Sequence, residues 1–155
     1  MKLAILRHGT AEPWRNDETD EDRALTVTGV DEVTRQGLAH FLSLNPESIW
    51  VSPYRRTQQT VASFTPTDTY FETTRILVPE SPPMVVLDAL INVHTNLLLV
   101  SHQPLVSQLI AKLSARAPYD CPMNPASLAI LEGDVFAAGC MQLEAIYHAN
   151  GDVTR

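Results

Sequence analysis

Two histidines and three arginines closely follow short apolar segments of the chain. The first segment leads into Arg7 and His8, the second into Arg55 and Arg56, and the third into His102. Guanidinium groups match phosphate oxygens in a bidentate geometry and stay charged at any physiological pH. A histidine with an ordinary pKa of about 6.5 is largely neutral near pH 7 and can act as a nucleophile. These residue types therefore predict a site for a phosphate dianion or a phosphoryl group.

The apolar segments before these residues are typical of buried strands. Leu3–Leu6, Ser48–Val51 and Leu97–Val100 are apolar throughout or nearly so, instead of alternating with polar residues. That pattern indicates strands that are covered on both faces of a sheet. Two further strands are expected around Ala126–Leu131 and Met141–Tyr147.

Helical patterns lie between the expected strands. Thr28 and Asp31 are predicted to form a capping box, and the helix that they start should end at Asn45. Its apolar face is expected to contain Val30, Val33, Leu38, Phe41 and Leu42.

Three more helices are expected further along the chain. Tyr54–Phe64 is one of them, and Pro104 marks the start of another because proline is favoured in a first helical turn. Met84–Val93 is ambiguous by periodicity alone, but its length favours a helix. The polar tail, Ala149–Arg155, is expected to be frayed.

Strands that alternate with helices predict an α/β protein. We expect a three-layer sandwich with a mainly parallel central sheet and helices on both faces, formed by residues 1–155 as a single domain. Ligands of such sheets bind at the carboxyl ends of the strands, so the histidines and arginines should meet at one edge. Arg55 and Arg56 would diverge by about 100 degrees at the start of a helix, so only one of them should point into the site.

Five segments of the chain resemble the histidine phosphatase superfamily, and within it the short bacterial phosphohistidine phosphatases. They occur in the family's order and are Leu6-Arg7-His8-Gly9, Arg23-Ala24-Leu25-Thr26 with Gly29, the run from Val51 to Thr60, Val78-Pro79-Glu80, and the run from Val100 to Val106. The chain departs from the family's usual residues at Thr10 and Ala24.

The resemblance implies a role for each of the residues named at the outset. It implies a phosphoglycerate mutase-like fold, with His8 as the phosphoryl-accepting nucleophile. Arg7, Arg56 and His102 would hold the transferred group, and the family's spacing selects Arg56 over Arg55. Because these positive side chains would stabilise the developing charge, we expect a metal-independent phosphatase without a cofactor.

The roles of two residues in the matching segments, Glu80 and Arg23, each have two possible interpretations. Glu80 is the candidate proton donor to the leaving group, or else a surface glutamate of a loop. If the substrate is phosphohistidine, Glu80 is dispensable, since imidazole leaves more readily than an alkoxide. Arg23 would bind substrate, or it would neutralise the neighbouring acidic run Asp17–Asp22. That run is either a solvated loop or a rim that selects a protein partner.

The charge and the cysteine content of the chain indicate which classes of partner and which cellular compartment to expect. The formal net charge of −7 and the pI of about 5.1 disfavour a nucleic-acid or membrane surface. Two cysteines are too few for a disulfide framework, and no long apolar stretch occurs, so a cytoplasmic protein is expected. We expect a monomer that holds a phosphate or sulfate anion at its site.

Three functions remain open at this point. The first is a phosphatase that acts on the phosphohistidine of a phosphorelay or phosphotransfer protein. The second is a small-molecule phosphomonoesterase or mutase, for which the chain looks too short to provide a lid. The third is a non-catalytic module that binds a phosphorylated ligand. A Rossmann or P-loop nucleotide site is disfavoured, because neither glycine-rich motif is found in the sequence.

Overall fold

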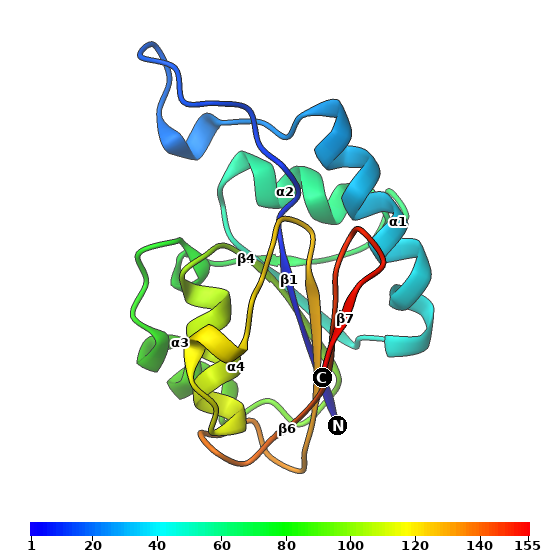
Figure 1. Ribbon diagram of the computed structural model, residues 1–155, viewed down its shortest axis with the longest axis vertical. Helices are drawn as coiled ribbons and strands as arrows, with labels where there is room; N and C mark the ends of the chain where they lie inside the picture. Colours follow the sequence, from blue (N-terminus) through cyan, green and yellow to red (C-terminus); the bar gives the residue numbers. More distant parts are fainter.

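The computed structural model, which describes residues 1–155, contains one seven-stranded sheet with helices on both faces (Figure 1). The strand order is β3-β2-β4-β1-β5-β6-β7. The first four strands of this order pair in parallel, and the other three are antiparallel to their neighbours. The predicted α/β sandwich is confirmed. The strands are β1 (Lys2–Arg7), β2 (Ser48–Val51), β3 (Glu72–Thr73), β4 (Leu97–Ser101), β5 (Leu128–Glu132), β6 (Gln142–Tyr147) and β7 (Val153–Thr154).

Four α-helices and three short 3-10 helices connect the strands. No helix is long and apolar enough to cross a membrane. The segment Met84–Val93, ambiguous by periodicity, is helical for most of its length. The α-helices are α1 (Val27–Leu44), α2 (Arg55–Ala62), α3 (Pro83–Leu90) and α4 (Leu105–Ser114), and the 3-10 helices are η1 (Asp20–Asp22), η2 (Arg75–Leu77) and η3 (Pro118–Asp120).

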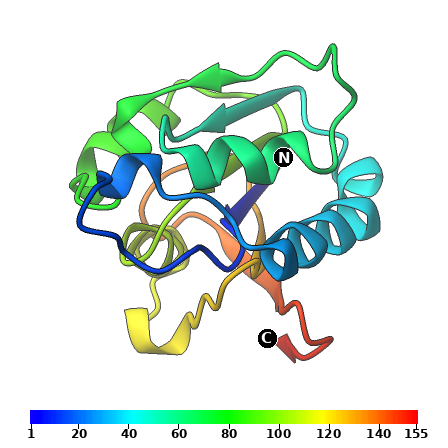
Figure 2. The ribbon, with the colours of Figure 1, turned by 90° about the horizontal axis from the view of Figure 1, so that it is seen from above.

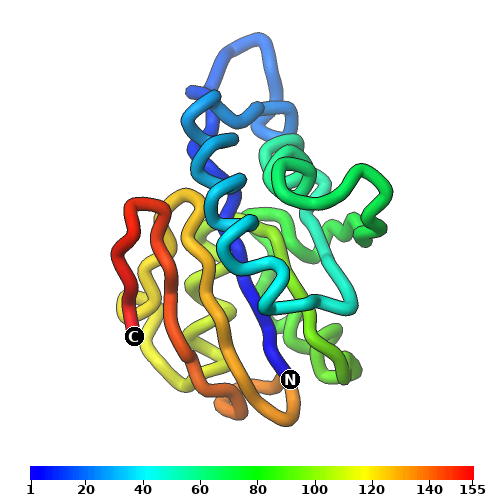
Figure 3. The backbone as a smooth tube through the Cα atoms, turned by 90° about the vertical axis from the view of Figure 1, so that its right-hand side faces the viewer, coloured from blue at the N-terminus to red at the C-terminus, as the bar shows by residue number.

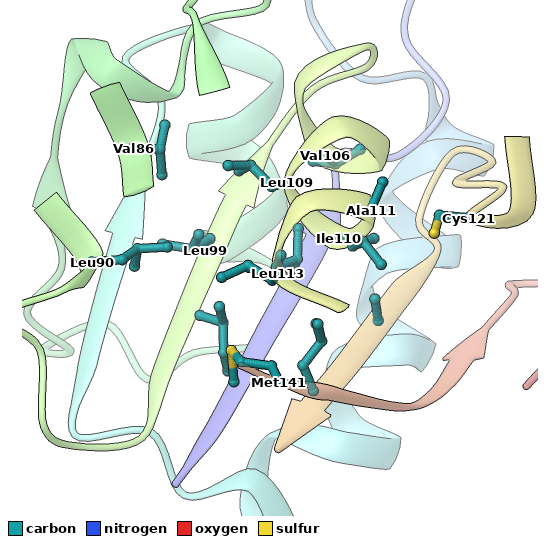
Figure 4. Close-up of a cluster of buried hydrophobic side chains, with 14 of the residues drawn as sticks. Val86, Leu90, Leu99, Val106, Leu109, Ile110, Ala111, Leu113, Cys121 and Met141 are labelled. Atoms are coloured by element: carbon teal, nitrogen blue, oxygen red, sulfur yellow. The ribbon is translucent and has the colours of Figure 1, made fainter. Parts of the chain in front are cut away.

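Two hydrophobic cores lie on opposite faces of the sheet. On β1, Leu3 and Ile5 belong to the larger core with α3 and α4, whereas Ala4 and Leu6 belong to the core under α1 and α2. Figure 4 shows side chains of α3 and α4 in the larger core, gathered near Leu99 of β4. Burial on both faces is the physical reason that β1 is apolar from Leu3 to Leu6 and β4 from Leu97 to Val100.

The start and the apolar face of α1 differ from the prediction. The N-cap is Thr26, whose hydroxyl accepts a hydrogen bond from the backbone N–H of Gly29 at 2.9 Å, so Thr28 is not the cap. Val30, Leu38 and Leu42, which were predicted for the apolar face, are exposed. The helix instead turns Gly37 inward, and an added Cβ there would overlap the ring of Phe64. Close packing against a small residue has overridden the hydrophobic periodicity.

The polar tail is ordered, which also differs from the prediction. Residues Val153–Thr154 form β7, which pairs with β6 in an antiparallel arrangement. The ring of His148 lies within hydrogen-bonding distance of two hydroxyl groups, that of Ser127 at 2.7 Å and that of Thr154 at 2.9 Å. These contacts tie the last residues to the sheet and account for the burial of His148.

Candidate active site

The carboxyl ends of β1, β2 and β4 meet at one edge of the sheet. Arg7 is aligned with Ser101 across β1 and β4, and Val51 is aligned with Val100 across β2 and β4. The residues that follow these strands are therefore neighbours, and Figure 2 looks down on this edge. The rings of His8 and His102 lie edge to face with their centroids 5.1 Å apart.

The backbone and the ring of His8 are held by hydrogen bonds. Its N–H donates to the carbonyl of Ser101 at 3.1 Å, and its carbonyl accepts from Ala126 at 2.9 Å. The ring Nδ1 lies 2.7 Å from the carbonyl oxygen of Gly9. Since a carbonyl oxygen can only accept, Nδ1 carries the ring proton. The other nitrogen, Nε2, therefore presents a lone pair, and the Nε–H of Arg56 donates to it at 3.3 Å.

His8 is neutral in this environment. The side chain is only 7 % exposed, and burial together with the charges of Arg56, Arg7 and Arg23 lowers the pKa of His8 to about 3. The hydrogen bond to Gly9 opposes this shift but does not outweigh burial. A neutral ring with an unprotonated Nε2 is the form that can attack phosphorus once the Nε–H of Arg56 releases that lone pair.

The loop that carries His8 packs closely against the start of α1. A Cβ added to Gly29 would overlap the carbonyl oxygen of Thr10, and one added to Gly9 would lie 2.5 Å from the carbonyl oxygen of Gly29. Thr26 also binds this loop, since its N–H donates to the Thr10 carbonyl at 2.9 Å. Glycine at these two positions permits a backbone approach that fixes the place of His8.

The structure places Arg56 in the site and Arg55 outside it. Arg56 is 3 % exposed and lies near the ring of Tyr54, with 5.0 Å between its guanidinium carbon and the ring centroid. Arg55 is exposed and donates to the carbonyl of Asp22. Burial lowers the pKa of Arg56, but a guanidinium remains protonated at physiological pH.

His102 and Arg7 each have a buried nitrogen without a partner, Nδ1 in His102 and Nε in Arg7. The Nε2 of His102 lies 2.8 Å from the hydroxyl of Ser52, and that hydroxyl already accepts from the N–H of Tyr54 at 3.3 Å. If Ser52 donates its proton to Nε2, the ring proton of His102 lies on Nδ1 and is a free donor. The η-nitrogen of Arg7 is bound to the carbonyl of Met123 at 2.8 Å.

His102 is also neutral. Burial lowers its pKa to about 2, and the charges of Arg56, Arg7 and Arg23, as well as a proton on His8 if one were present, act in the same direction. His102 therefore interacts with an anion as a neutral hydrogen-bond donor in the first instance. A bound anion that brings negative charge beside the ring would favour its protonation.

These side chains line one pocket of about 430 Å³ at the strand ends. It has three arginines and one carboxylate, although the chain as a whole has a net charge of −7. The site is therefore a local positive region suited to an anion. The lining residues are Arg7, His8, Gly9, Thr10, Ala11, Asp20, Arg23, Arg56, Pro79, His102, Gln103 and Pro125.

Asp20 is the site residue that the sequence analysis missed. It belongs to the acidic run before Arg23, and its carboxylate binds both Arg23 and Arg56. The spacing of three residues between Asp20 and Arg23 was a signal for that pair. Nothing in the sequence pattern connects Asp20 with Arg56, which lies 36 residues further along the chain.

Glu80 lies beside the pocket but does not line it. The side chain is exposed, and its carboxylate accepts a hydrogen bond from the hydroxyl of Tyr54 at 3.4 Å. The ring of Tyr54 in turn lies 5.0 Å from the ring of His102. Tyr54 thus contacts both Glu80 and the pocket residue His102. Arg23, by contrast, does line the pocket.

No protein-family model matches the chain. Comparisons with curated proteins and with solved structures both find phosphatases named SixA. A curated protein of Haemophilus influenzae, named a phosphohistidine phosphatase SixA homolog, is 31% identical over 128 residues, which are 73% of this chain and 77% of that protein. The structure of the protein histidine phosphatase SixA complexed with tungstate has a TM-score of 0.82 and 26% identity, over 97% of this chain and 98% of the other.

A more distant structure shares the fold alone. The phosphoserine phosphatase of Entamoeba histolytica, solved in complex with phosphoserine, has a TM-score of 0.69 at 16% identity. The alignment covers 94% of this chain and 95% of the other.

Proposed function

This chain belongs to the histidine phosphatase superfamily, and we propose that it removes the phosphoryl group from a phosphohistidine of another protein, with His8 as the nucleophile. The observation that carries this proposal is the lone pair of His8 Nε2, which faces the buried Arg56 at the bottom of a positive pocket. The resemblance of the whole chain to the SixA structure with tungstate, an analogue of phosphate, supports the same conclusion.

The first step transfers the phosphoryl group to His8. A bond forms between His8 Nε2 and phosphorus as the Nε–H of Arg56 turns from Nε2 to a phosphoryl oxygen. The bond between phosphorus and the substrate's ring breaks, and that ring, which carries a proton on its other nitrogen, leaves as neutral imidazole. The Nδ1–H of His8 stays bound to the carbonyl of Gly9, which stabilises the positive charge on the phosphorylated ring. Arg7, Arg56 and the Nδ1–H of His102 bind the equatorial oxygens, on which charge is spread in the transition state.

The second step returns His8 to its starting form. A water oxygen forms a bond to phosphorus, the bond to Nε2 breaks, and the proton that water loses passes to solvent or to the released phosphate. Inorganic phosphate leaves, and the ring is again neutral with its proton on Nδ1. Since the arginines provide the stabilising charge throughout, we propose that neither step requires a metal ion.

The place of Glu80 favours a phosphohistidine over a phosphate ester. An alkoxide leaving group needs a proton donor close to the reacting atoms, whereas imidazole is a better leaving group. Glu80 lies outside the pocket lining and is bound to Tyr54 instead. We therefore propose that Glu80 is dispensable in this reaction, and that Arg23 binds the substrate from the rim of the pocket.

The proposal is tested by single-turnover release of phosphate in EDTA. The substrates are a phosphohistidine-bearing phosphotransfer domain and para-nitrophenyl phosphate, and the proteins are wild type, His8→Ala and the control His94→Ala, which removes an exposed histidine. We expect release from the phosphoprotein by wild type and His94→Ala, and none by His8→Ala. Preferential release from the ester would indicate a small-molecule phosphatase, and no release from either would indicate a binding module.

A further inference from the structure

The carboxylate of Asp20 binds the guanidinium groups of two arginines of the pocket, Arg23 and Arg56. One carboxylate oxygen lies 3.1 Å from Nη2 of Arg56. The other accepts from Nε and Nη2 of Arg23 at 3.1 and 2.9 Å. The backbone carbonyl of Asp20 also accepts from Nη1 of Arg56 at 2.7 Å. Asp20 is the one acidic residue in the pocket lining.

These contacts use most of the hydrogen-bonding capacity of Arg56. Its Nε–H donates to His8, and one N–H of each terminal nitrogen donates to Asp20. A guanidinium has five N–H groups in all, so two remain for a ligand. Both terminal nitrogens of Arg56 are bound to Asp20, so a phosphoryl group that binds the two together in the bidentate manner competes with Asp20 for them.

A phosphoryl group can displace this carboxylate because it carries more charge. The Asp20 side chain is 39% exposed, whereas Arg56 is 3% exposed, so Asp20 is the partner that can exchange with solvent. Although partial burial opposes ionisation, the hydrogen bonds and charges of Arg56 and Arg23 lower the pKa of Asp20. Asp20 is therefore a carboxylate at neutral pH, with one negative charge against the two of a phosphate dianion.

The segment that carries Asp20 has few buried contacts. It connects β1 with α1 and rises above the strand ends (Figure 3). The 3-10 helix η1 contains no buried residue. Its residue Glu21 forms a solvent-exposed ion pair with Arg75, in which the nitrogen and the oxygen lie 3.4 Å apart. Segments that lack buried apolar contacts open at low free-energy cost, so this segment can move without disturbing either core.

We propose that Asp20 is an internal competing anion, which binds Arg23 and Arg56 and is displaced from Arg56 when a phosphoryl group binds. It thereby acts as a specificity-determining residue, since an anion that cannot outcompete a tethered carboxylate is excluded. The inference adds to the proposed function a statement about how the same site admits its substrate. Anion binding without turnover tests it separately from the phosphatase reaction.

Calorimetric titration with inorganic phosphate and with tungstate tests the competition. The proteins are wild type, Asp20→Asn and the control Asp22→Asn. The control removes the same charge at a position two residues away, where the side chain has only Thr19 as a hydrogen-bond partner. We expect Asp20→Asn to bind both anions about five- to tenfold more tightly and Asp22→Asn to stay within about twofold of wild type. Equal or weaker binding by Asp20→Asn would overturn the inference.

Hydrogen exchange of the wild-type protein tests the displacement itself. We expect saturating tungstate to increase amide exchange in residues 17–23, because the carbonyl and the carboxylate of Asp20 lose Arg56. Unchanged or slower exchange in that segment would show that Asp20 stays in place, and it would overturn the inference even if Asp20→Asn binds anions more tightly. Neither measurement depends on hydrolysis, so both results stand if phosphohistidine proves not to be the substrate.

Discussion

The chemistry of the site depends on which atoms of a few side chains remain free. The carbonyl of Gly9 orients the ring of His8, so Nε2 is the unprotonated nitrogen and the proposed nucleophile. The Nε2 of His102 lies 2.8 Å from the hydroxyl of Ser52, and when that hydroxyl donates to it, the unpartnered Nδ1 is a donor. Arg56 touches His8 directly, and its planar fork suits the equatorial oxygens of a transferred phosphoryl group.

A conservative change of Arg56 should therefore be costly. Arg56→Lys keeps the positive charge but loses the planar fork and the Nε–H that donates to His8. We expect its single-turnover rate to fall about a hundredfold, as for loss of one donor in an oxyanion hole. The matched control is Arg55→Lys, the same change at the exposed neighbouring residue, which should retain a rate close to wild type. Similar losses in both variants would contradict the assignment of Arg56 to the phosphoryl group.

At the scale of elements, the start of α1 supports the loop that carries His8. Thr26 caps the helix and also binds the Thr10 carbonyl through its N–H. Gly29, one turn into the helix, meets the same carbonyl in a contact that leaves no space for a side chain. The start of α1 and the loop that carries His8 therefore pack as one unit, and the position of the proposed nucleophile depends on an element that contributes no reactive group.

The cap can be tested with two threonines of the same turn. Thr26→Ala removes the oxygen that accepts from Gly29, and we expect it to lower the free energy of unfolding by about 1 kcal/mol. Thr28→Ala removes an exposed hydroxyl that caps nothing, so its stability should remain within about 0.5 kcal/mol of wild type. Urea unfolding measures both. A larger loss for Thr28→Ala would return the cap to the position that the sequence pattern predicted.

At the scale of the whole molecule, an acidic protein holds a positive, partly buried site. The helices on both faces and the strand ends together bury His8 and His102 within a pocket that also contains three arginines. Burial lowers the pKa of His8 to about 3 and that of His102 to about 2. Both rings therefore remain neutral in the folded protein at pH values at which the unfolded chain would protonate them.

This difference predicts a loss of stability in mild acid. Above pH 6.5 neither state binds these protons, and their contribution to stability is fully present. As the pH falls from 6.5 toward the folded-state values, the unfolded chain takes up protons that the folded protein does not. Each histidine then lowers the free energy of unfolding by up to about 1.4 kcal/mol per pH unit.

Denaturant unfolding between pH 7 and pH 5 measures this effect. We expect His8→Asn to lose stability less steeply than wild type as the pH falls. The control His94→Asn, which removes an exposed histidine, should keep the wild-type slope. If His8→Asn and wild type had the same slope, protonation of His8 would not be coupled to unfolding.

The sequence by itself determined the class of fold, the places of its main strands along the chain and the edge of the sheet at which the histidines and arginines gather. Uniformly apolar runs such as Leu97–Val100 can only be strands or helix segments that are covered on both faces, and parallel strands bring their carboxyl ends together. That local information was sufficient to place His8, Arg7 and His102 at one edge. The family resemblance selected Arg56 over the adjacent Arg55 as the site residue. Of these two arginines, the structure places only Arg56 in the pocket.

Only the tertiary structure decided how α1 packs, how the C-terminal tail is held and which carboxylate binds the arginines of the pocket. The inward side of α1 depends on Phe64 packing against Gly37, and the tail is ordered by hydrogen bonds to His148. The pair of Asp20 and Arg56 joins residues 36 positions apart, on segments whose patterns carry no trace of each other. Periodicity and propensity report which segments are buried, whereas contacts between polar side chains depend on where the folded chain brings single atoms.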